Sequence, residues 1–216
     1  MQEEEVSAGR LIATMFEMMR DNAVVVGASI LGLSVLGIAG DLYNPEALTS
    51  LPITIAGAVA QFVIIRQALD RMGLVRRSRQ AVGAYIGVSI LANIGIILGM
   101  LLLVIPGVVL AIRWSIAAPI VLAEEQGAGD SLSDSWARTK EHAMSILVAY
   151  LVPLGLLAAS LVVYAMGDPE SVEIPLMTAL IGNVCSNAFL AMSSLMSVAI
   201  YSAVTHAPDR LEEIFA

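Results

Sequence analysis

Hydrophobic residues form long charge-free runs that alternate with short charged segments along the chain. These runs occupy 22–40, 47–65, 80–112, 114–123, 142–167 and 174–208. Only Arg113 interrupts the stretch 80–123, and a single helix over that stretch would be about 66 Å long, about twice the thickness of the hydrocarbon layer. Pro106-Gly107 lies where a turn is needed, so we predict a helical hairpin there.

The length of these runs predicts an all-α membrane bundle in one integral membrane domain over 1–216. A helix that spans the hydrocarbon needs about 20 apolar residues. The chain is 58% hydrophobic and 14% charged, with a mean hydropathy of +0.84, which excludes disorder and a soluble enzyme. We predict six transmembrane helices at about 22–40, 52–70, 82–104, 107–123, 143–166 and 175–205.

The basic residues predict the orientation of the chain in the membrane. The connecting segments on one side of the predicted spans, 41–52 and 168–175, carry acidic residues and no Lys or Arg. The positive-inside rule therefore places both termini in the cytoplasm, as for a multi-pass protein of a bacterial inner membrane. The basic residues assigned to the cytoplasmic side are Arg10, Arg20, Arg66, Arg71, Arg76, Arg77, Arg79, Arg138, Lys140 and Arg210.

Two cytoplasmic segments have the pattern of amphipathic helices that lie on the membrane, at 6–20 and 130–142. The second opens with acidic and ends with basic residues, which suits the helix dipole. Aromatic rings favour the interface between lipid and water, so we expect anchors at Phe16, Trp136, Tyr85 and Tyr201. Membrane lipids are therefore the expected partners.

The two amphipathic segments align at an offset of 120 residues. Phe16, Arg20 and Asp21 then correspond to Trp136, Lys140 and Glu141, and a long apolar span follows each segment. This pattern favours a parallel repeat of an interfacial helix and a hairpin, although the side chains are hardly alike.

Arg113 is the most unusual residue, because it lies inside a predicted span. A cation there costs about 2.5 to 3.5 kcal/mol and needs compensation, and the only acidic residue in the predicted spans is Asp70, the last residue of 52–70. One interpretation is a cavity in which Arg113 binds an anion or lipid headgroup, and the other is a purely structural role in helix packing. Four amides at comparable positions in their spans would complete its hydrogen bonds: Gln61, Asn93, Asn183 and Asn187.

The sixth span suggests an alternative function. Asn183, Asn187, Ser194, Ser197 and Tyr201 follow one face of this helix, and such a stripe lines the path of a small transporter or channel if water reaches it. Packing toward other helices is the simpler interpretation. Small residues in the third span favour close packing within the chain, while a homo-oligomer or an unidentified membrane partner stays open.

The residues that enzymes use do not form a pattern in this sequence. His142 and His206 fall at span ends without a second metal ligand at helical spacing, and Glu124-Glu125 has no histidine partner. Cys185 is the only cysteine, no Gly-rich phosphate loop is present, and the net charge of −8 argues against nucleic acid. We expect no enzymatic activity, no metal and no cofactor.

One segment resembles a known family. In the run 105–119, Pro106-Gly107 is followed by Arg113-Trp114 and Pro119, and then by Gly127 and Ser135-Trp136. This arrangement is similar to the glycerophosphoryl diester phosphodiesterase membrane-domain family and its stand-alone YciC-like members. The resemblance covers about 102–140 and implies a multi-span fold in which these residues belong to a common structural core.

The resemblance does not by itself imply catalysis. Some relatives carry a fused phosphodiesterase domain, but Ala216 follows the last predicted span closely, so we expect neither that domain nor its activity. The sequence thus predicts a non-catalytic inner-membrane protein that contacts lipid and organises a compact bundle.

Overall fold

The computed structural model describes residues 6–43, 50–75, 80–166 and 174–205, and its regular structure is entirely helical within those ranges. The predicted all-α fold is therefore confirmed. The helices are α1 (Ala8–Asp21), α2 (Ala23–Tyr43), α3 (Ser50–Arg71), α4 (Gln80–Leu102), α5 (Val104–Arg113), α6 (Ala117–Glu124), α7 (Ala128–Arg138), α8 (Ala143–Ala165) and α9 (Leu176–Thr205).

Six helical segments of the described chain are long and apolar enough to cross a membrane, as the sequence predicted. Each has a mean hydropathy between 1.4 and 2.5. They are Ala23–Leu42, Leu51–Arg71, Val82–Leu102, Val104–Glu124, Ala143–Ala165 and Leu176–Thr205.

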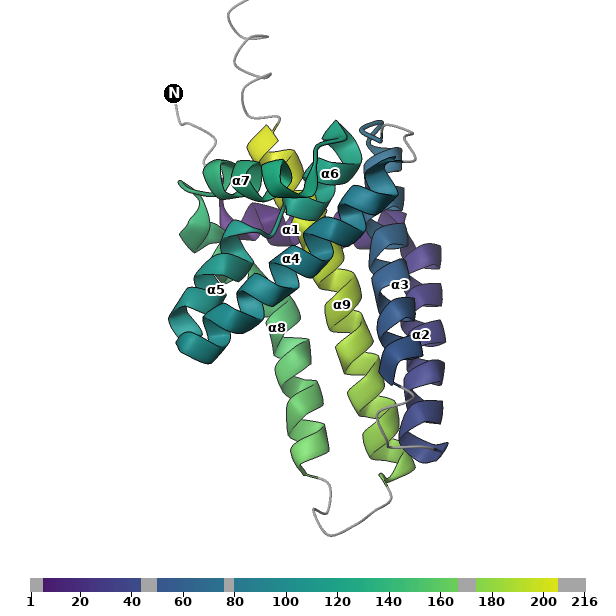
Figure 1. The fold of residues 1–216 in the computed structure, drawn as a ribbon. Coiled ribbons are helices and arrows are strands. Elements are labelled where there is room, and N and C mark those ends of the chain that lie inside the picture. The colour runs from purple at the N-terminus through teal and green to yellow at the C-terminus, as the bar shows by residue number, and fades with distance from the viewer. Residues whose placement is uncertain (1–5, 44–49, 76–79, 167–173, 206–216) are drawn as a thin grey trace, which may run out of the picture.

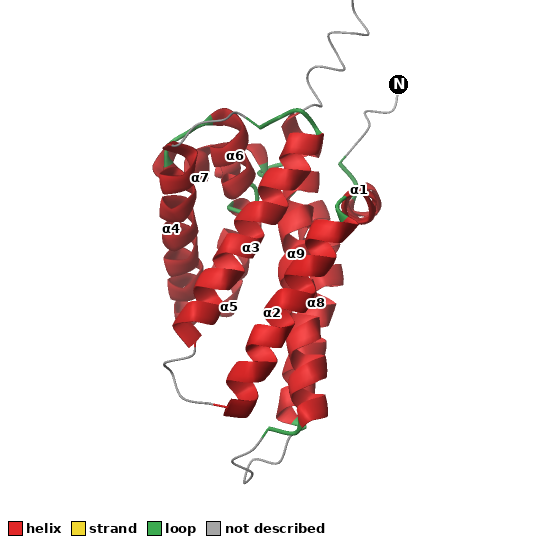
Figure 2. Cartoon of the chain, turned by 90° about the vertical axis from the view of Figure 1, so that its right-hand side faces the viewer, coloured by secondary structure: helices red, strands yellow, loops and turns green. Residues whose placement is uncertain are grey.

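The long helix α9 forms the centre of the bundle. It packs against α8, α2, α3 and α1, and its second half, from Ala191 to Tyr201, is almost wholly buried. The short helices α1, α6 and α7 all lie toward the same end of the bundle, called the α7 end below (Figure 1). The view turned by 90° shows α4 at one flank of the bundle and α1 at the other (Figure 2).

The first amphipathic helix is covered by protein more than the sequence suggested. The hydroxyl of Ser7 accepts a hydrogen bond from the Arg10 amide at 3.3 Å, which caps α1 at its start. Leu11 and Met15 are buried, and α1 packs against α9 and α8. The apolar face predicted to enter lipid is thus largely part of the protein core.

The second amphipathic helix begins and ends earlier than the predicted range 130–142. It spans Ala128–Arg138, with Asp130 in the first turn and Arg138 in the last. The hydroxyl of Thr139 donates to the Ser135 carbonyl at 2.7 Å, and residues 139–142 form turns that lead into α8. No described side chain caps the start of α7 at Gly127, so the helix dipole, with Asp130 at one end and Arg138 at the other, favours this shorter helix.

The predicted fourth span, 107–123, is not one helix. The chain breaks first at Leu103, whose backbone is extended, so Pro106 and Gly107 lie inside the first turn of α5. Proline is tolerated there because it has no N–H and the first amides of a helix have no carbonyl partner. A second break at residues 114–116 separates α5 from α6.

The order of the elements fits the repeat suggested by the sequence. Helix α2 begins at Ala23 and α8 at Ala143, which are the aligned positions, and each follows an amphipathic helix at the α7 end. Helices α1, α2 and α3 then correspond to α7, α8 and α9. The segment α4 to α6 lies between the two units in the chain.

The connection between α4 and α5 is entirely apolar. No side chain from Ile94 to Ile112 is polar, and residues 101–105 are between 67% and 79% exposed. In both views this tip ends well short of the far ends of α2, α8 and α9 (Figures 1 and 2). A turn at the headgroups would ordinarily carry polar residues, so these features favour a tip within the hydrocarbon.

We expect a cysteine at Leu103 to react poorly with a membrane-impermeant thiol reagent from either side of the membrane. The test uses Leu103→Cys in a Cys185→Ala background, in intact and in opened vesicles. Met166→Cys and Met72→Cys are the controls, because both residues are exposed at opposite ends of the bundle. Labelling of the cysteine at 103 as strong as at 166 would show that the hairpin crosses completely.

Candidate functional site

Arg113 lies at the α7 end, at the last residue of α5. Its guanidinium carbon is 5.1 Å from the centre of the Trp136 ring, and Nη1 donates to the Trp136 carbonyl at a long 3.4 Å. Its own carbonyl accepts from the hydroxyls of Ser135, at 2.7 Å, and Thr139, at 3.2 Å. The backbone of Arg113 therefore fixes α7, while its cationic group rests on an exposed aromatic ring.

The structure does not bring two of the four predicted amides, Asn183 and Asn187, to Arg113. Asn183 donates to Asp41 Oδ2 at 2.7 Å and to the Tyr164 hydroxyl at 3.0 Å, and Asn187 donates to the Ser34 hydroxyl at 3.2 Å. Asn183 precedes Tyr201, which lies at the α7 end, by a helix rise of about 27 Å. The expected single site is therefore corrected: these amides join helices in the other half of the bundle.

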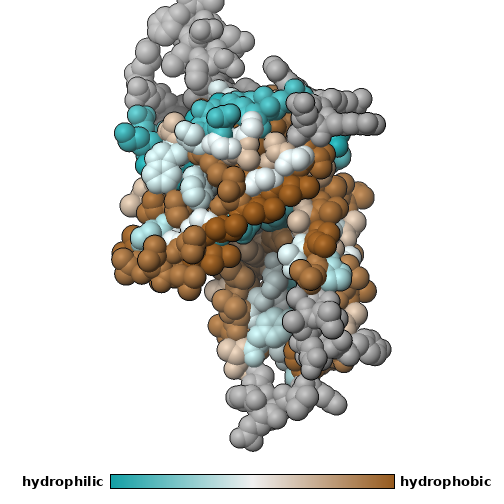
Figure 3. All heavy atoms as spheres, in the orientation of Figure 1, coloured by the Kyte–Doolittle hydropathy of each residue, from teal (hydrophilic) through white to brown (hydrophobic). Residues whose placement is uncertain are grey.

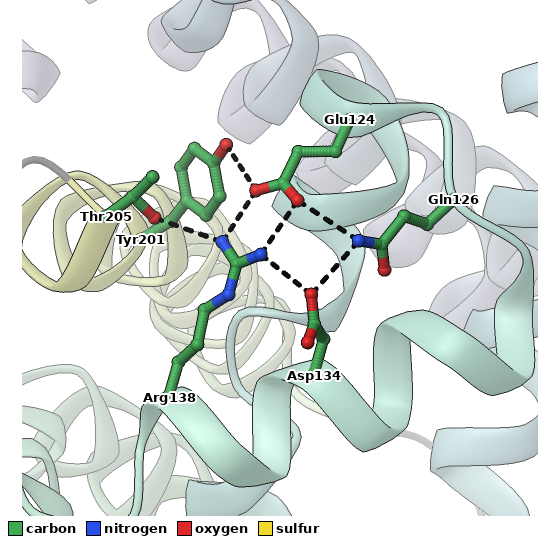
Figure 4. A network of polar contacts seen from close by, with 6 residues as sticks. All are labelled: Glu124, Gln126, Asp134, Arg138, Tyr201 and Thr205. Atoms are coloured by element: carbon green, nitrogen blue, oxygen red, sulfur yellow. Dashed lines mark hydrogen bonds and ion pairs between the residues drawn. The ribbon is translucent and has the colours of Figure 1, made fainter.

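An ionic network joins α6, α7 and α9 at the α7 end (Figure 4). Arg138 donates to both carboxylate oxygens of Glu124, at 2.6 and 2.8 Å, and to Asp134 at 2.7 Å. Gln126 donates to the same two carboxylates at 3.1 and 3.0 Å, and the Tyr201 hydroxyl donates to Glu124 at 3.0 Å. Only the Asp134–Arg138 pair, one helical turn apart, was readable from the sequence.

This network perturbs the titration of its members outside the spans. The hydrogen bond from Gln126, followed by the charge of Arg138, lowers the pKa of the Asp134 carboxyl, although desolvation opposes this. The hydrogen bond to Glu124 is the largest cause that raises the pKa of Arg138. Because the pKa of Asp134 is lowered on folding, its contribution to stability is present at neutral pH. That contribution is lost as the pH falls through the folded-state value.

The four predicted aromatic anchors divide into two groups. Phe16 and Trp136 are 43% and 40% exposed, and this degree of exposure is compatible with contact to the interface. Tyr85 and Tyr201 are only 5% and 3% exposed, so their rings face protein and the anchor role is corrected for them. Proximity to a span end indicated depth but not which side of the helix faces lipid.

Gln61 and Asn93 do come together, at a polar hollow between α3, α4, α8, α9 and the α5–α6 turn. The hollow has a volume of about 190 Å³. Its hydrogen-bonding groups include Tyr85, Ser89, Ser115, Tyr150 and three serines of α9, and none of the described residues that line it is charged. Hydrophilic atoms are visible directly beneath α4, between hydrophobic surfaces (Figure 3).

Most serines of the hollow use their protons within their own helix. Ser193 and Ser194 donate to the Leu190 carbonyl at 3.1 and 2.7 Å, and Ser197 donates to the Ser194 carbonyl at 2.7 Å. Their oxygens still have lone pairs that can accept a hydrogen bond. The Ser115 hydroxyl is buried without a partner among the described residues. Gln61 and Asn93 were predicted as site residues, but their partners were not, because the groups of the hollow come from five separate segments.

The fold, the apolar spans and the absence of strands from the described residues define a multi-span helical membrane protein. Residues 82–206 match the membrane domain of glycerophosphoryl diester phosphodiesterase. This match covers well over half of the chain, which therefore belongs to that family, as its resemblance over 102–140 indicated. No curated protein and no solved structure matches the chain.

The family match includes α4 to α9 and thus most walls of the hollow and the whole ionic network. In the described part of the chain, no group of three His, Cys, Asp or Glu side chains is arranged to hold a metal ion. Among the described residues, the Arg113 guanidinium and the polar hollow both have hydrogen-bonding groups that no protein group satisfies.

Proposed function

We propose that this chain is a non-catalytic lipid-binding protein of a bacterial inner membrane, with both termini in the cytoplasm. Arg113 binds the anionic headgroup of a phospholipid at the α7 end. The proposal rests on the contacts of the Arg113 guanidinium. It makes one long hydrogen bond, to the Trp136 carbonyl, and lies over the Trp136 ring, but it has no carboxylate partner among the described residues.

The chemistry of Arg113 suits a phosphate. A guanidinium has five donors in one plane and binds phosphate through two parallel hydrogen bonds. The Trp136 ring holds that plane, which lowers the conformational cost of binding. Arg138, by contrast, is already engaged by two carboxylates, so it has little capacity left for a lipid.

A transport path along α9 is the alternative function. It requires a continuous hydrated route, but Ser194 and Ser197 are only 3% and 6% exposed and donate to carbonyls of their own helix. Asn187, which would continue the route, donates to Ser34 instead. These contacts favour lipid binding over transport.

Arg113→Gln is expected to lower retention of phosphatidylglycerol about tenfold, because a hydrogen bond to a charged group contributes about 1.5 to 3 kcal/mol. Native mass spectra of the gently extracted protein measure the bound lipid and the number of subunits. Arg66→Gln is the matched control, since that guanidinium also lies over an aromatic ring, 5.8 Å from the centre of Phe62.

Equal loss of phosphatidylglycerol from both variants would reduce the effect to a general one of positive charge and contradict a site at Arg113. Equal retention by the wild type and Arg113→Gln would contradict it as well. A thermal unfolding curve of each variant verifies that the comparison concerns folded protein.

A further inference from the structure

We infer that the polar hollow beneath α4 is a second site, which binds the polar end of an uncharged lipid that carries hydroxyl and carbonyl groups. Diacylglycerol is the simplest lipid with this chemistry. The inference goes beyond the Arg113 site and does not depend on it, because the two sites use different residues and different chemistry.

The lining of the hollow disfavours a charged ligand group. Gln61, Asn93 and the surrounding hydroxyls are all neutral, and none of the described lining residues is an Arg, Lys, Asp or Glu. A phosphate that left water for this site would lose its hydration without gaining a counter-charge, which is costly in a medium of low polarity. A neutral group with hydrogen-bonding capacity avoids that cost.

The position of the hollow indicates a lipid rather than a water-soluble ligand. Asn93, at its rim, is exposed in the middle of α4, and its neighbours Ile90 and Ile94 are 54% and 51% exposed. The hydrophilic atoms beneath α4 are flanked by hydrophobic surface on the same face (Figure 3). A ligand that enters from this side must leave its apolar part in the hydrocarbon, as acyl chains do.

The hydrogen-bonding groups match an alcohol and its esters. The oxygens of Ser193, Ser194 and Ser197 can accept from a hydroxyl, because their own protons are used in α9. The Ser115 hydroxyl, in the wall of the hollow, has no partner among the described residues, so its proton can be donated to a ligand carbonyl. At about 30 Å³ for each water, the hollow has room for about six waters or for one compact headgroup.

The wall next to Ser115 is fixed before any ligand binds. Trp114 lies against Gly95 so closely that a Cβ at Gly95 would overlap the edge of its ring at Cζ3 and would be 2.7 Å from Cη2. This contact holds the α5–α6 turn on α4, so the site is largely preformed and the cost of ordering it is small.

The test measures retention of diacylglycerol and of phosphatidylglycerol with the same acyl chains, added separately to the delipidated full-length protein before native mass spectrometry. We expect one diacylglycerol to bind the wild type. Ser193→Leu, which fills the hollow, should lower its retention at least tenfold. Ser115→Ala should lower it about fivefold, the effect of one hydrogen bond. Ser34→Ala and Arg113→Gln should leave it unchanged, since neither residue lines the hollow.

Three results would overturn the inference. Wild-type protein that retains no diacylglycerol would mean that the hollow holds water only. Undiminished retention by Ser193→Leu would place the lipid elsewhere, and loss on Arg113→Gln would assign it to the α7 end. Thermal unfolding separates these results from misfolding, and Ser115→Ala, which removes one atom, provides a variant that keeps the packing. Retention of phosphatidylglycerol tests the Arg113 site, and retention of diacylglycerol tests the hollow. Either proposal can therefore fail without the other.

Discussion

Arg138→Leu is expected to lower the free energy of unfolding by about 1.5 to 3 kcal/mol, the range for hydrogen bonds to charged groups. The substitution leaves the carboxylates of Glu124 and Asp134 without the cation that joins them, so only Gln126 bridges the two side chains. It also removes the contact of Arg138 with Thr205 of α9, at 3.4 Å. Arg138 is thus a residue of α7 that contacts both α6 and α9, and the substitution removes both contacts (Figure 4).

Thermal unfolding in detergent micelles measures this effect. Lys140→Leu is the matched control, because Lys140 is an exposed cation in the turn after α7 and has the same charge. The double variant Arg138→Leu/Glu124→Leu should regain part of the loss, since replacing both partners removes the unpaired carboxylate of Glu124. If Lys140→Leu destabilises the protein equally, the network contributes no more than general electrostatics.

The spans could be predicted from the sequence because lipid leaves few alternatives. Every backbone amide in hydrocarbon must be paired within its own helix, so a charge-free run of sufficient length becomes a helix. The starts of α2 and α8 and the existence of the two amphipathic helices followed from charge and periodicity, whereas α2 extends to Tyr43, beyond the predicted end at 40. The break after Arg113 did not, because it depends on Ser135 and Thr139, which donate to the Arg113 carbonyl from a different helix.

Arg113 lies at the α7 end and not at the depth predicted for it, because depth was inferred by counting residues from the ends of straight spans. The predicted fourth span, 107–123, is a single straight helix, and in such a helix Arg113 lies within the bundle, away from both ends. Helix α4 instead crosses the bundle obliquely, so equal residue counts from span ends do not give equal depths (Figure 1). For the same reason Gln61 and Asn93 meet in the hollow, whereas Asn183 and Asn187 bind groups on α2 and α8.

The packing of the hairpin offers a second large effect. Gly107→Ala is expected to lower the free energy of unfolding by about 1 to 3 kcal/mol, the usual cost of overpacking. A Cβ at Gly107 would be 2.7 Å from the backbone nitrogen of Met100 and 2.9 Å from its Cα. Backbone atoms cannot rotate away as a side chain can, so α5 must move from α4. That movement would also loosen the close approach at Gly99, where a Cβ would be 2.9 Å from the Gly107 Cα.

Gly155→Ala is the control for this prediction. It adds the same methyl group in the middle of α8, where a Cβ would meet nothing within 4 Å. Helix propensity alone favours alanine over glycine by about 1 kcal/mol, so this variant should unfold at the same temperature as the wild type or slightly above it. Because propensity acts in the same direction at both positions, a drop seen only at Gly107 measures the contact between α4 and α5. Equal unfolding temperatures for the two variants would mean that the two helices are not packed together as closely as these distances require.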